Sequence, residues 1–170
     1  MSLEAFKVRV LPVKYKLYRF ALRITGDQEE AKDIVQEVMI RVWNKRENMD
    51  QTTNMEAWCM QITKNLCYDR LKSKAFQTRS SLPEHWQVED TASTPARKAE
   101  MSDIMNQIHR FISTLPDKQK EVIHLRDIEG YSYNEIGEIM GIDINQVKVN
   151  LFRARKTIRE SLSKINVYGI

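Results

Sequence analysis

Apolar residues recur every three or four positions along almost the whole chain, and this spacing limits the fold more than any other feature. It places apolar side chains on one face of an α-helix, whereas a half-buried β-strand requires strict alternation. Glycine and proline, which interrupt helices, occur only five and four times in 170 residues, so long helices are favoured. We therefore predict an all-α fold with two small helical domains joined by a flexible linker.

The first domain is predicted to span residues 8–76 and to contain three helices. The first helix carries the apolar residues Val13, Leu17, Ala21 and Ile24. Gly26 follows as a stop signal, and Asp27 with Glu30 is spaced as a capping box for a second helix, expected to end near Arg46. The third helix carries the apolar residues Met55, Trp58, Ile62, Leu66 and Leu71.

Residues 77–99 lack helical periodicity and contain many Ser, Thr and Pro residues, which predicts a linker. The second domain is predicted to span residues 100–168. It begins with an amphipathic helix whose apolar residues are Met101, Ile104, Ile108, Phe111, Ile112 and Leu115. Pro116 either ends this helix or opens the next one, which continues toward Gly130.

The last forty residues contain the signals of a helix-turn-helix. Ser132 and Glu135 form an S-x-x-E capping box, and Gly141 ends the helix that they begin. Asp143 and Gln146 are spaced as a second box before a helix with the inner stripe Ile144, Val147, Leu151, Ala154, Ile158 and Leu162. Two helices joined by a short glycine-containing turn are typical of this DNA-binding motif.

The outer face of the last helix mixes basic and apolar residues, with Lys148, Val149, Phe152, Arg153 and Lys156 among them. From residue 144 to 170 there are six Lys or Arg residues and one acid, so positive charge is concentrated here. A solvated face would explain the charge but not Val149 and Phe152. Major-groove readout uses arginine contacts to guanine and apolar contacts to thymine methyl groups. The sequence therefore favours base-reading DNA binding over a solvated basic helix.

Motifs in both halves of the chain resemble the extracytoplasmic-function (ECF) sigma factors of bacterial RNA polymerase. Those that resemble region 2 of the family are Arg23–Asp27, Ala31–Val38, Val42–Trp43 and Ala57–Trp58, with Asn65 and Asp69–Arg70. Those that resemble region 4 are Leu115–Pro116, Glu129–Ile136 and Val147–Arg155. The resemblance implies a dissociable subunit, not itself a catalyst, that directs core polymerase to promoters and helps to melt them.

The resemblance also implies roles for individual residues. On the second helix, the clamp helices of the large core subunit would be bound by Asp33, Gln36, Glu37 and Arg41. On the third helix, the melted minus-ten element would be bound by Lys64, Asn65, Tyr68, Arg70 and Lys72, since single-stranded DNA requires charge and stacking surfaces. The minus-thirty-five element would be bound by Arg126, Asn145, Gln146, Lys148, Val149, Phe152, Arg153 and Lys156. The family usually has serine where this chain has Val149. The promoter sequence that other family members recognise therefore cannot be assigned to this chain.

Other functional classes are disfavoured. His85, His109 and His124 share no ligand spacing, and Cys59 and Cys67 match neither a redox nor a zinc motif, so we expect no metal site and no cofactor. No secretory signal is evident, and no apolar run approaches the roughly 20 residues of a membrane span. We therefore expect a cytoplasmic protein without membrane insertion. The net charge of +4 suits a polyanionic partner but does not identify one.

Two alternatives to a sigma factor remain. One is a stand-alone helix-turn-helix repressor or activator whose N-terminal helices dimerise; the other is an inhibitor that sequesters polymerase and never touches DNA. The family resemblance further implies an anti-sigma partner, and we expect the free protein to be a monomer. Two weak DNA contacts tethered by a linker would act together once polymerase positions them, so the free chain should bind duplex DNA poorly.

Overall fold

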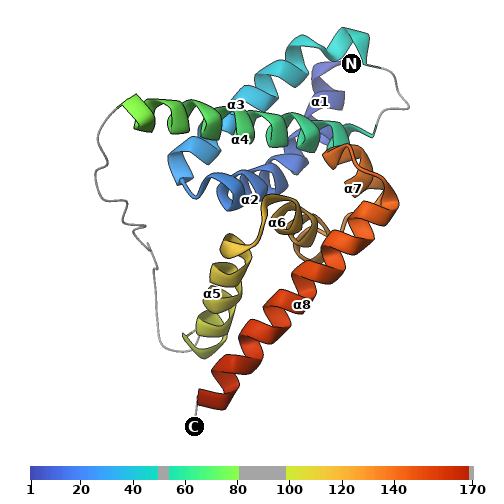
Figure 1. Ribbon diagram of the computed structural model, residues 1–170. Helices are drawn as coiled ribbons and strands as arrows, with labels where there is room; N and C mark the ends of the chain where they lie inside the picture. Colours follow the sequence, from blue (N-terminus) through green and yellow to red (C-terminus); the bar gives the residue numbers. More distant parts are fainter. Residues whose placement is uncertain (50–53, 81–98, 169–170) are drawn as a thin grey trace.

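The computed structural model describes residues 1–49, 54–80 and 99–168 (Figure 1). Every regular element in these ranges is helical, and none is a β-strand, which confirms the predicted all-α fold. The predicted linker lies mostly outside the described residues. Within the described ranges no helix is both long and apolar enough to span a membrane.

The N-terminal half contains α1 (Leu3–Arg9), η1 (Leu11–Val13), α2 (Lys14–Thr25), α3 (Gln28–Asn44), η2 (Arg46–Asn48) and α4 (Met55–Ser80). Gly26 ends α2 in the left-handed conformation, with φ of 68°. The Asp27 carboxylate then accepts a hydrogen bond from the Glu30 N–H at 3.1 Å and caps α3, as its spacing predicts. Helix α1 was not predicted; its buried Phe6 packs edge-on against Trp43 at 5.2 Å.

The C-terminal half contains α5 (Ala99–Thr114), α6 (Asp117–Ile123), the π-helical segment η3 (His124–Ile128), α7 (Tyr133–Met140) and α8 (Ile144–Tyr168). Pro116 is the N-cap of α6, so it opens the second helix of this half. Residues 77–80, expected in the linker, form the last turn of α4, since no glycine or proline interrupts the chain before Pro83. Figure 1 shows α8 running away from the N-terminal half.

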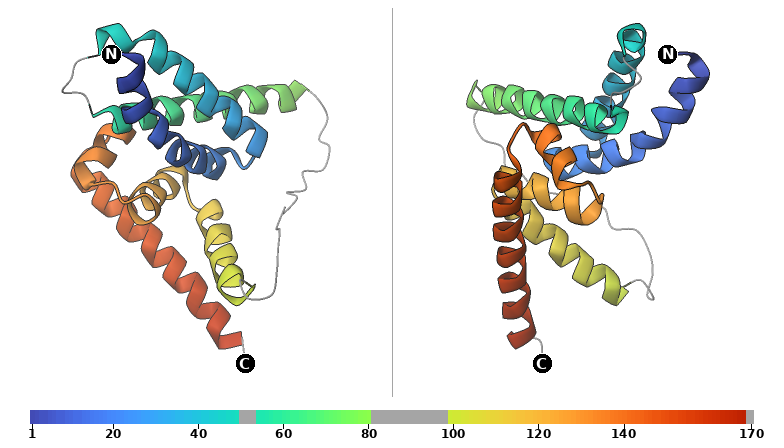
Figure 2. Two further views of the ribbon diagram at one scale, coloured as in Figure 1. Left: turned by 180° about the vertical axis from the view of Figure 1, so that it is seen from behind. Right: turned by 90° about the vertical axis from the view of Figure 1, so that its right-hand side faces the viewer.

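Helix α4 is buried on two sides. It packs against α2 and α3 of its own half and against α7 of the other half (Figure 2). A second buried face of α4 lies outside the apolar stripe predicted from the sequence. It is formed by Cys59, Thr63 and Cys67, which are fully buried and follow one another at intervals of one turn. One continuous apolar cluster consequently joins the two halves, with Phe20 and Met60 on one side and Leu125 and Ile136 on the other.

Candidate nucleic-acid interface

The predicted helix-turn-helix is formed by α7 and α8. The Ser132 hydroxyl accepts from the Glu135 N–H at 3.2 Å, and the Glu135 carboxylate accepts from the Ser132 N–H at 2.8 Å, so the capping box is complete. Gly141 ends α7 with φ of 66°. Asp143 then accepts a hydrogen bond from the Gln146 N–H at 2.8 Å at the start of α8. Local caps therefore fix both ends of the turn.

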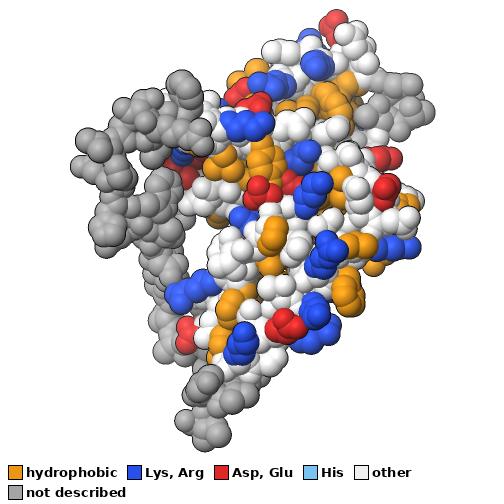
Figure 3. Space-filling model, viewed as in Figure 1, with side chains coloured by type: hydrophobic (Ala, Val, Ile, Leu, Met, Phe, Trp, Pro, Cys, Tyr) orange, Lys and Arg blue, Asp and Glu red, His pale blue; other side chains and the backbone are white. Residues whose placement is uncertain are grey.

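The outer face of α8 is open to solvent. Val147, Leu151 and Ala154 are buried against the domain, whereas Phe152 is 69% exposed and Val149 is 45% exposed. The expected DNA-binding residues that are exposed on or near this face are Asn145, Gln146, Lys148, Val149, Phe152, Arg153 and Lys156. Figure 3 shows Lys and Arg side chains along α8 with hydrophobic side chains between them. Ile144, expected on the inner stripe, is the first residue of α8 and is 38% exposed, so the buried stripe begins at Val147.

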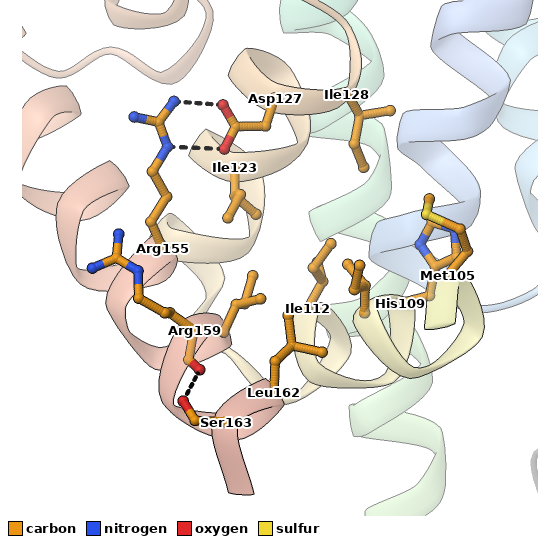
Figure 4. Close-up of a pocket in the computed structure, with 12 residues that line it drawn as sticks. Met105, His109, Ile112, Ile123, Asp127, Ile128, Arg155, Arg159, Leu162 and Ser163 are labelled. Atoms are coloured by element: carbon orange, nitrogen blue, oxygen red, sulfur yellow. Dashed lines mark hydrogen bonds and ion pairs between the residues drawn. The ribbon is translucent and has the colours of Figure 1, made fainter. Parts of the chain in front are cut away.

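Two arginines near this face are fixed by intramolecular contacts. Arg126 donates to the Tyr131 carbonyl oxygen at 2.8 Å, and its guanidinium lies 4.8 Å from the centre of the Tyr133 ring. Arg155 of α8 donates two hydrogen bonds to the Asp127 carboxylate, at 3.0 and 2.6 Å (Figure 4). The Arg155 pair joins the recognition helix to η3, so this arginine supports the helix rather than extending from it. In the described parts of the chain, Arg153 forms no ion pair.

An apolar groove of about 560 Å³ separates part of α5 from α8. Figure 4 shows Met105, Ile112 and Leu162 in this groove, with the Asp127–Arg155 pair at its rim. The sequence predicts Ile104 on the buried stripe of this helix, but it is 54% exposed, and the neighbouring Met105 is 45% exposed. Among the described side chains of the predicted stripe, Ile112 and Leu115 are buried, whereas Ile108 and Phe111 are partly buried.

Four of the five expected minus-ten residues share one side of α4. At about 100° per residue, Lys64, Asn65, Tyr68 and Lys72 fall within an arc of roughly 100°. Asn65 and Lys72 are exposed, while Lys64 and Tyr68 are half-buried. Arg70 lies on the opposite side, where it binds the Glu30 and Glu37 carboxylates of α3 at 2.6 and 2.9 Å. The structure therefore separates Arg70 from the other four residues.

The half-buried part of this arc faces an acidic residue of α6. Glu121 is only 5% exposed and lies near enough to Tyr68 and Lys64 to be affected by both, although the Tyr68 hydroxyl has no hydrogen-bond partner among the described residues. Burial and the Glu121 carboxylate raise the pKa of the Tyr68 phenol. Burial likewise raises the pKa of Glu121, although Tyr68 and Lys64 oppose this effect. A buried carboxylate of the C-terminal half thus lies near the arc expected to bind DNA.

The expected polymerase-binding residues of α3 divide into two sets. Asp33 and Gln36 are exposed, whereas Glu37 is half-buried between Arg41 and Arg70. The hydrogen bond from Arg70 lowers the pKa of Glu37. Burial opposes this shift, and Arg41 adds to it. Glu37 and Arg41 therefore belong to an intramolecular ion-pair network.

A neighbouring apolar surface was missed by the sequence analysis. This α2–α3 groove of about 720 Å³ is lined by Leu11, Lys14, Tyr15, Tyr18, Lys32, Val35, Gln36, Met39 and Ile40. Tyr15 and Ile40 are 62% and 60% exposed. Ile40 could have been recognised from the sequence, because it falls outside the buried stripe of α3.

The described residues contain no cluster of three or more His, Cys, Asp or Glu side chains suited to a metal ion. Cys59 and Cys67 are buried free thiols, and burial raises the pKa of each to about 12. A thiol with so high a pKa stays protonated and is a poor nucleophile at neutral pH. Both cysteines therefore pack as small apolar residues.

Comparisons with known proteins identify both halves. The family described as Sigma-70 region 2 matches residues 12–77, and Sigma-70, region 4 matches residues 105–158. The ECF RNA polymerase sigma factor SigW of Bacillus subtilis is 30% identical over 167 residues, which cover 94% of this chain and 89% of SigW. The ECF sigma factor SigE of Mycolicibacterium smegmatis is 31% identical over 150 residues, covering 88% of this chain but 58% of SigE.

The fold agrees with these matches. The sigma factor RpoE from Bartonella quintana, crystallised with the anti-sigma factor NepR, has a TM-score of 0.80 and 25% identity to this chain. The match covers 95% of this chain and 98% of that one, so it includes both halves. Because SigW also matches along most of its length, the chain belongs to the ECF family of RNA polymerase sigma factors, the initiation factors that direct core polymerase to promoters.

Proposed function

We propose that this chain places bacterial core RNA polymerase at promoters through two DNA-binding surfaces and one polymerase-binding surface. It supplies contacts only, and the polymerase carries out the chemistry of RNA synthesis. The observation that carries the proposal is the exposed pair Phe152 and Arg153 on the helix-turn-helix of a region 4 domain. An exposed aromatic ring is costly on a merely solvated helix. Beside an arginine that forms no ion pair with the described residues, it suits a major groove.

The minus-thirty-five surface is proposed to lie on the outer face of α8. Arg153 would donate to a guanine edge, and Val149 and Phe152 would contact thymine methyl groups. The remaining residues of the surface are Arg126, Asn145, Gln146, Lys148 and Lys156. Arg126 is held by Tyr131 and Tyr133, so its role is to present a fixed positive charge beside the recognition helix.

The minus-ten surface is proposed to be the arc of Lys64, Asn65, Tyr68 and Lys72 on α4. Tyr68 offers a ring for stacking on an unpaired base, and the two lysines offer charge for the phosphate backbone. Arg70 is left out of this surface, because its guanidinium is bound to α3.

The polymerase-binding surface is proposed to be the α2–α3 groove, with Gln36 inside it and Asp33 exposed on the same helix. The exposed side chains of Tyr15 and Ile40 supply the apolar area that a stable protein interface requires at its centre. Glu37 and Arg41 support this surface from the side through their ion pairs.

We further propose that the chain acts in the cytoplasm, is a monomer when free of its partners and is regulated by an anti-sigma factor. The RpoE protein of similar fold was crystallised with such a factor. This similarity supports a partner of the same class for this chain but does not name it.

The test is to add the purified chain to sigma-free bacterial core polymerase and to assay transcription from a genomic promoter library. The proposal predicts that a defined set of promoters fires only when the chain is present. If no promoter fires while the chain alone protects a palindromic site, the protein is instead a stand-alone repressor or activator. If it only blocks other sigma factors, it is a sequestering inhibitor.

Matched variants assign the surfaces. Ile40→Asp should weaken binding to core polymerase, whereas Ile104→Asp, at an equally exposed isoleucine of α5, should not. Arg153→Ala should cost roughly 1–3 kcal/mol at one promoter position and relax the base choice there. An equal loss on every sequence would make Arg153 a phosphate contact.

A further inference from the structure

The exposed side of α8 carries a narrow row of four side chains. At about 100° per residue, Asn145, Val149, Phe152 and Lys156 fall within an arc of roughly 60°, on the side opposite the buried stripe of the helix. All four are exposed, and Asn145, the second residue of α8, begins the row. In a helix-turn-helix, the N-terminal residues of the recognition helix contact base edges. Asn145 therefore stands where a side chain of α8 can reach a base pair.

Asn145 differs chemically from the rest of this row. Lysine side chains only donate hydrogen bonds, and Val149 and Phe152 neither donate nor accept, whereas a carboxamide presents a donor and an acceptor side by side. In the major groove, adenine presents its N7 acceptor next to its N6 donor, and asparagine pairs with both atoms at once. The row thus contains one side chain suited to adenine beside apolar residues suited to thymine methyl groups.

Three amide side chains lie in the first two turns of α8, and the structure distinguishes them. Asn150 is half-buried, and its Nδ2 donates to the Gln146 carbonyl oxygen at 2.8 Å, so one of its donors is already used. Gln146 is exposed but lies about 100° around the helix from Asn145, on the side of Arg153. Asn145 is exposed within the row, and its side chain forms no hydrogen bond with the described residues.

The turn before α8 fixes the position of Asn145. The Asp143 carboxylate accepts a hydrogen bond from the Gln146 N–H at 2.8 Å, and the Asp143 carbonyl oxygen accepts one from the Val147 N–H at 3.1 Å. Both hydrogen bonds span Asn145 and close the first turn of the helix around it. A group that is held in place before binding loses less conformational entropy when it forms its contacts. Asp143 is therefore suited to position Asn145.

We propose that Asn145 specifies an adenine in the minus-thirty-five element and that Asp143 is its positioning residue. The Asn145 amide accepts a hydrogen bond from N6 of the base and donates one to N7. One helical turn, about 5.4 Å, separates Asn145 from Val149, and base pairs are about 3.4 Å apart. The adenine therefore lies within about two base pairs of the base that Val149 contacts. The inference rests on the proposed minus-thirty-five function of α8.

Base substitution in an active promoter tests the contact. Holoenzyme is assembled from core polymerase and the full chain, and each base pair of the minus-thirty-five element of one firing promoter is replaced in turn. The wild type should prefer adenine at one position, and Asn145→Ala should lose this preference alone, on the order of tenfold. Asn150→Ala removes the same amide elsewhere on α8 and should keep the preference. The melting temperature of Asn145→Ala should match that of the wild type, since Asn145 is exposed.

An adenine analogue separates a direct contact from an effect of DNA shape. 7-Deazaadenine lacks the N7 acceptor but still pairs with thymine. At the assigned position it should weaken transcription by the wild type about fivefold, the effect of one hydrogen bond, and should not weaken transcription by Asn145→Ala any further. An equal effect of the analogue on both proteins would overturn the contact.

Asp143→Ala tests the positioning role through two effects of opposite sign. Removing a negative charge beside DNA should tighten binding to every duplex, whereas losing the cap should reduce the preference for adenine. Asp143→Asn removes the same charge but keeps a good capping side chain, so it should retain the preference. If both variants discriminate equally well, Asp143 does not position Asn145.

The inference is overturned if Asn145→Ala relaxes no adenine position, or if it loses activity equally on every sequence, as a phosphate contact would. Loss of the preference in Gln146→Ala but not in Asn145→Ala would also overturn it. If no promoter fires with the wild type, the sigma function fails instead. Selection of random duplexes by the chain alone at low salt, where phosphate contacts strengthen binding, then still decides whether the wild type enriches an adenine that Asn145→Ala does not.

Discussion

Arg70 of α4 donates a hydrogen bond to Glu37 of α3 at 2.9 Å, and its second terminal nitrogen binds Glu30 at 2.6 Å. These hydrogen bonds outweigh the effect of burial and lower the pKa of both carboxyl groups. The bridge fixes the crossing of two helices that carry different proposed surfaces. Arg70 therefore acts in the structure of the N-terminal domain.

The first prediction is that Arg70→Ala lowers the free energy of unfolding by about 1–3 kcal/mol, because two partly buried carboxylates lose their charged donor. Urea denaturation measures the change. Lys72→Ala, at an exposed site on the same helix, should alter stability by no more than about 0.5 kcal/mol but weaken single-stranded DNA binding. If Arg70→Ala kept full stability and lost DNA binding, Arg70 would belong to the minus-ten surface.

Helix boundaries could be predicted where the signal is local. Asp27 and Ser132 cap their helices as expected, and Gly26 and Gly141 end theirs in the left-handed conformation. Capping depends on a side chain and a backbone group three residues away, so a single sequence contains all the information. Helix α1 was missed because seven residues are too few to establish a stripe.

Contacts between distant segments could not be predicted in the same way. The second buried face of α4, including Cys59 and Cys67, faces a partner that periodicity alone does not identify. Glu37 and Arg70 are each plausible surface residues, and only the packing of α3 on α4 brings them together across 33 positions. The face of α8 was predicted well, because helical geometry separates its inside from its outside within one element.

The second prediction concerns Gly137 in α7. An added Cβ atom would lie 2.9 Å from the Ile142 carbonyl oxygen, which belongs to the turn before α8. Gly137→Ala must therefore displace this turn, at an expected cost of roughly 1–3 kcal/mol. The melting temperature and the affinity for a duplex that contains the minus-thirty-five element should both fall. The neighbouring Glu138→Ala, at an exposed site, should leave both measurements nearly unchanged; equal behaviour of the two variants would contradict the steric account.

The third prediction separates recognition from stability at Phe152. The side chain is 69% exposed, so Phe152→Ala should change the free energy of unfolding by no more than about 0.5 kcal/mol. It should nevertheless reduce transcription and weaken the preference for thymine at one upstream position, since the ring would lose its contact with the methyl group. Leu151→Ala, at the adjacent buried residue, should instead destabilise the domain by about 2–5 kcal/mol. A large loss of stability in Phe152→Ala would show that the ring is structural.

The fourth prediction is a pH dependence of the ion pair between Arg19 of α2 and Glu129, the residue after η3. The Arg19 guanidinium donates two hydrogen bonds to the Glu129 carboxylate, at 2.7 and 2.8 Å. Burial alone would raise the pKa of Glu129, but the Arg19 hydrogen bonds and the neighbouring His124 lower it from 4.5 to about 2. A lowered carboxyl pKa stabilises the folded state above pH 4.5, and this contribution of about 3 kcal/mol is lost as the pH falls toward 2. Urea unfolding of the wild type and Glu129→Gln should therefore differ by about this amount at pH 6 and much less at pH 3. A difference that stays constant between these pH values would mean that the ionised form of Glu129 does not hold the two halves together.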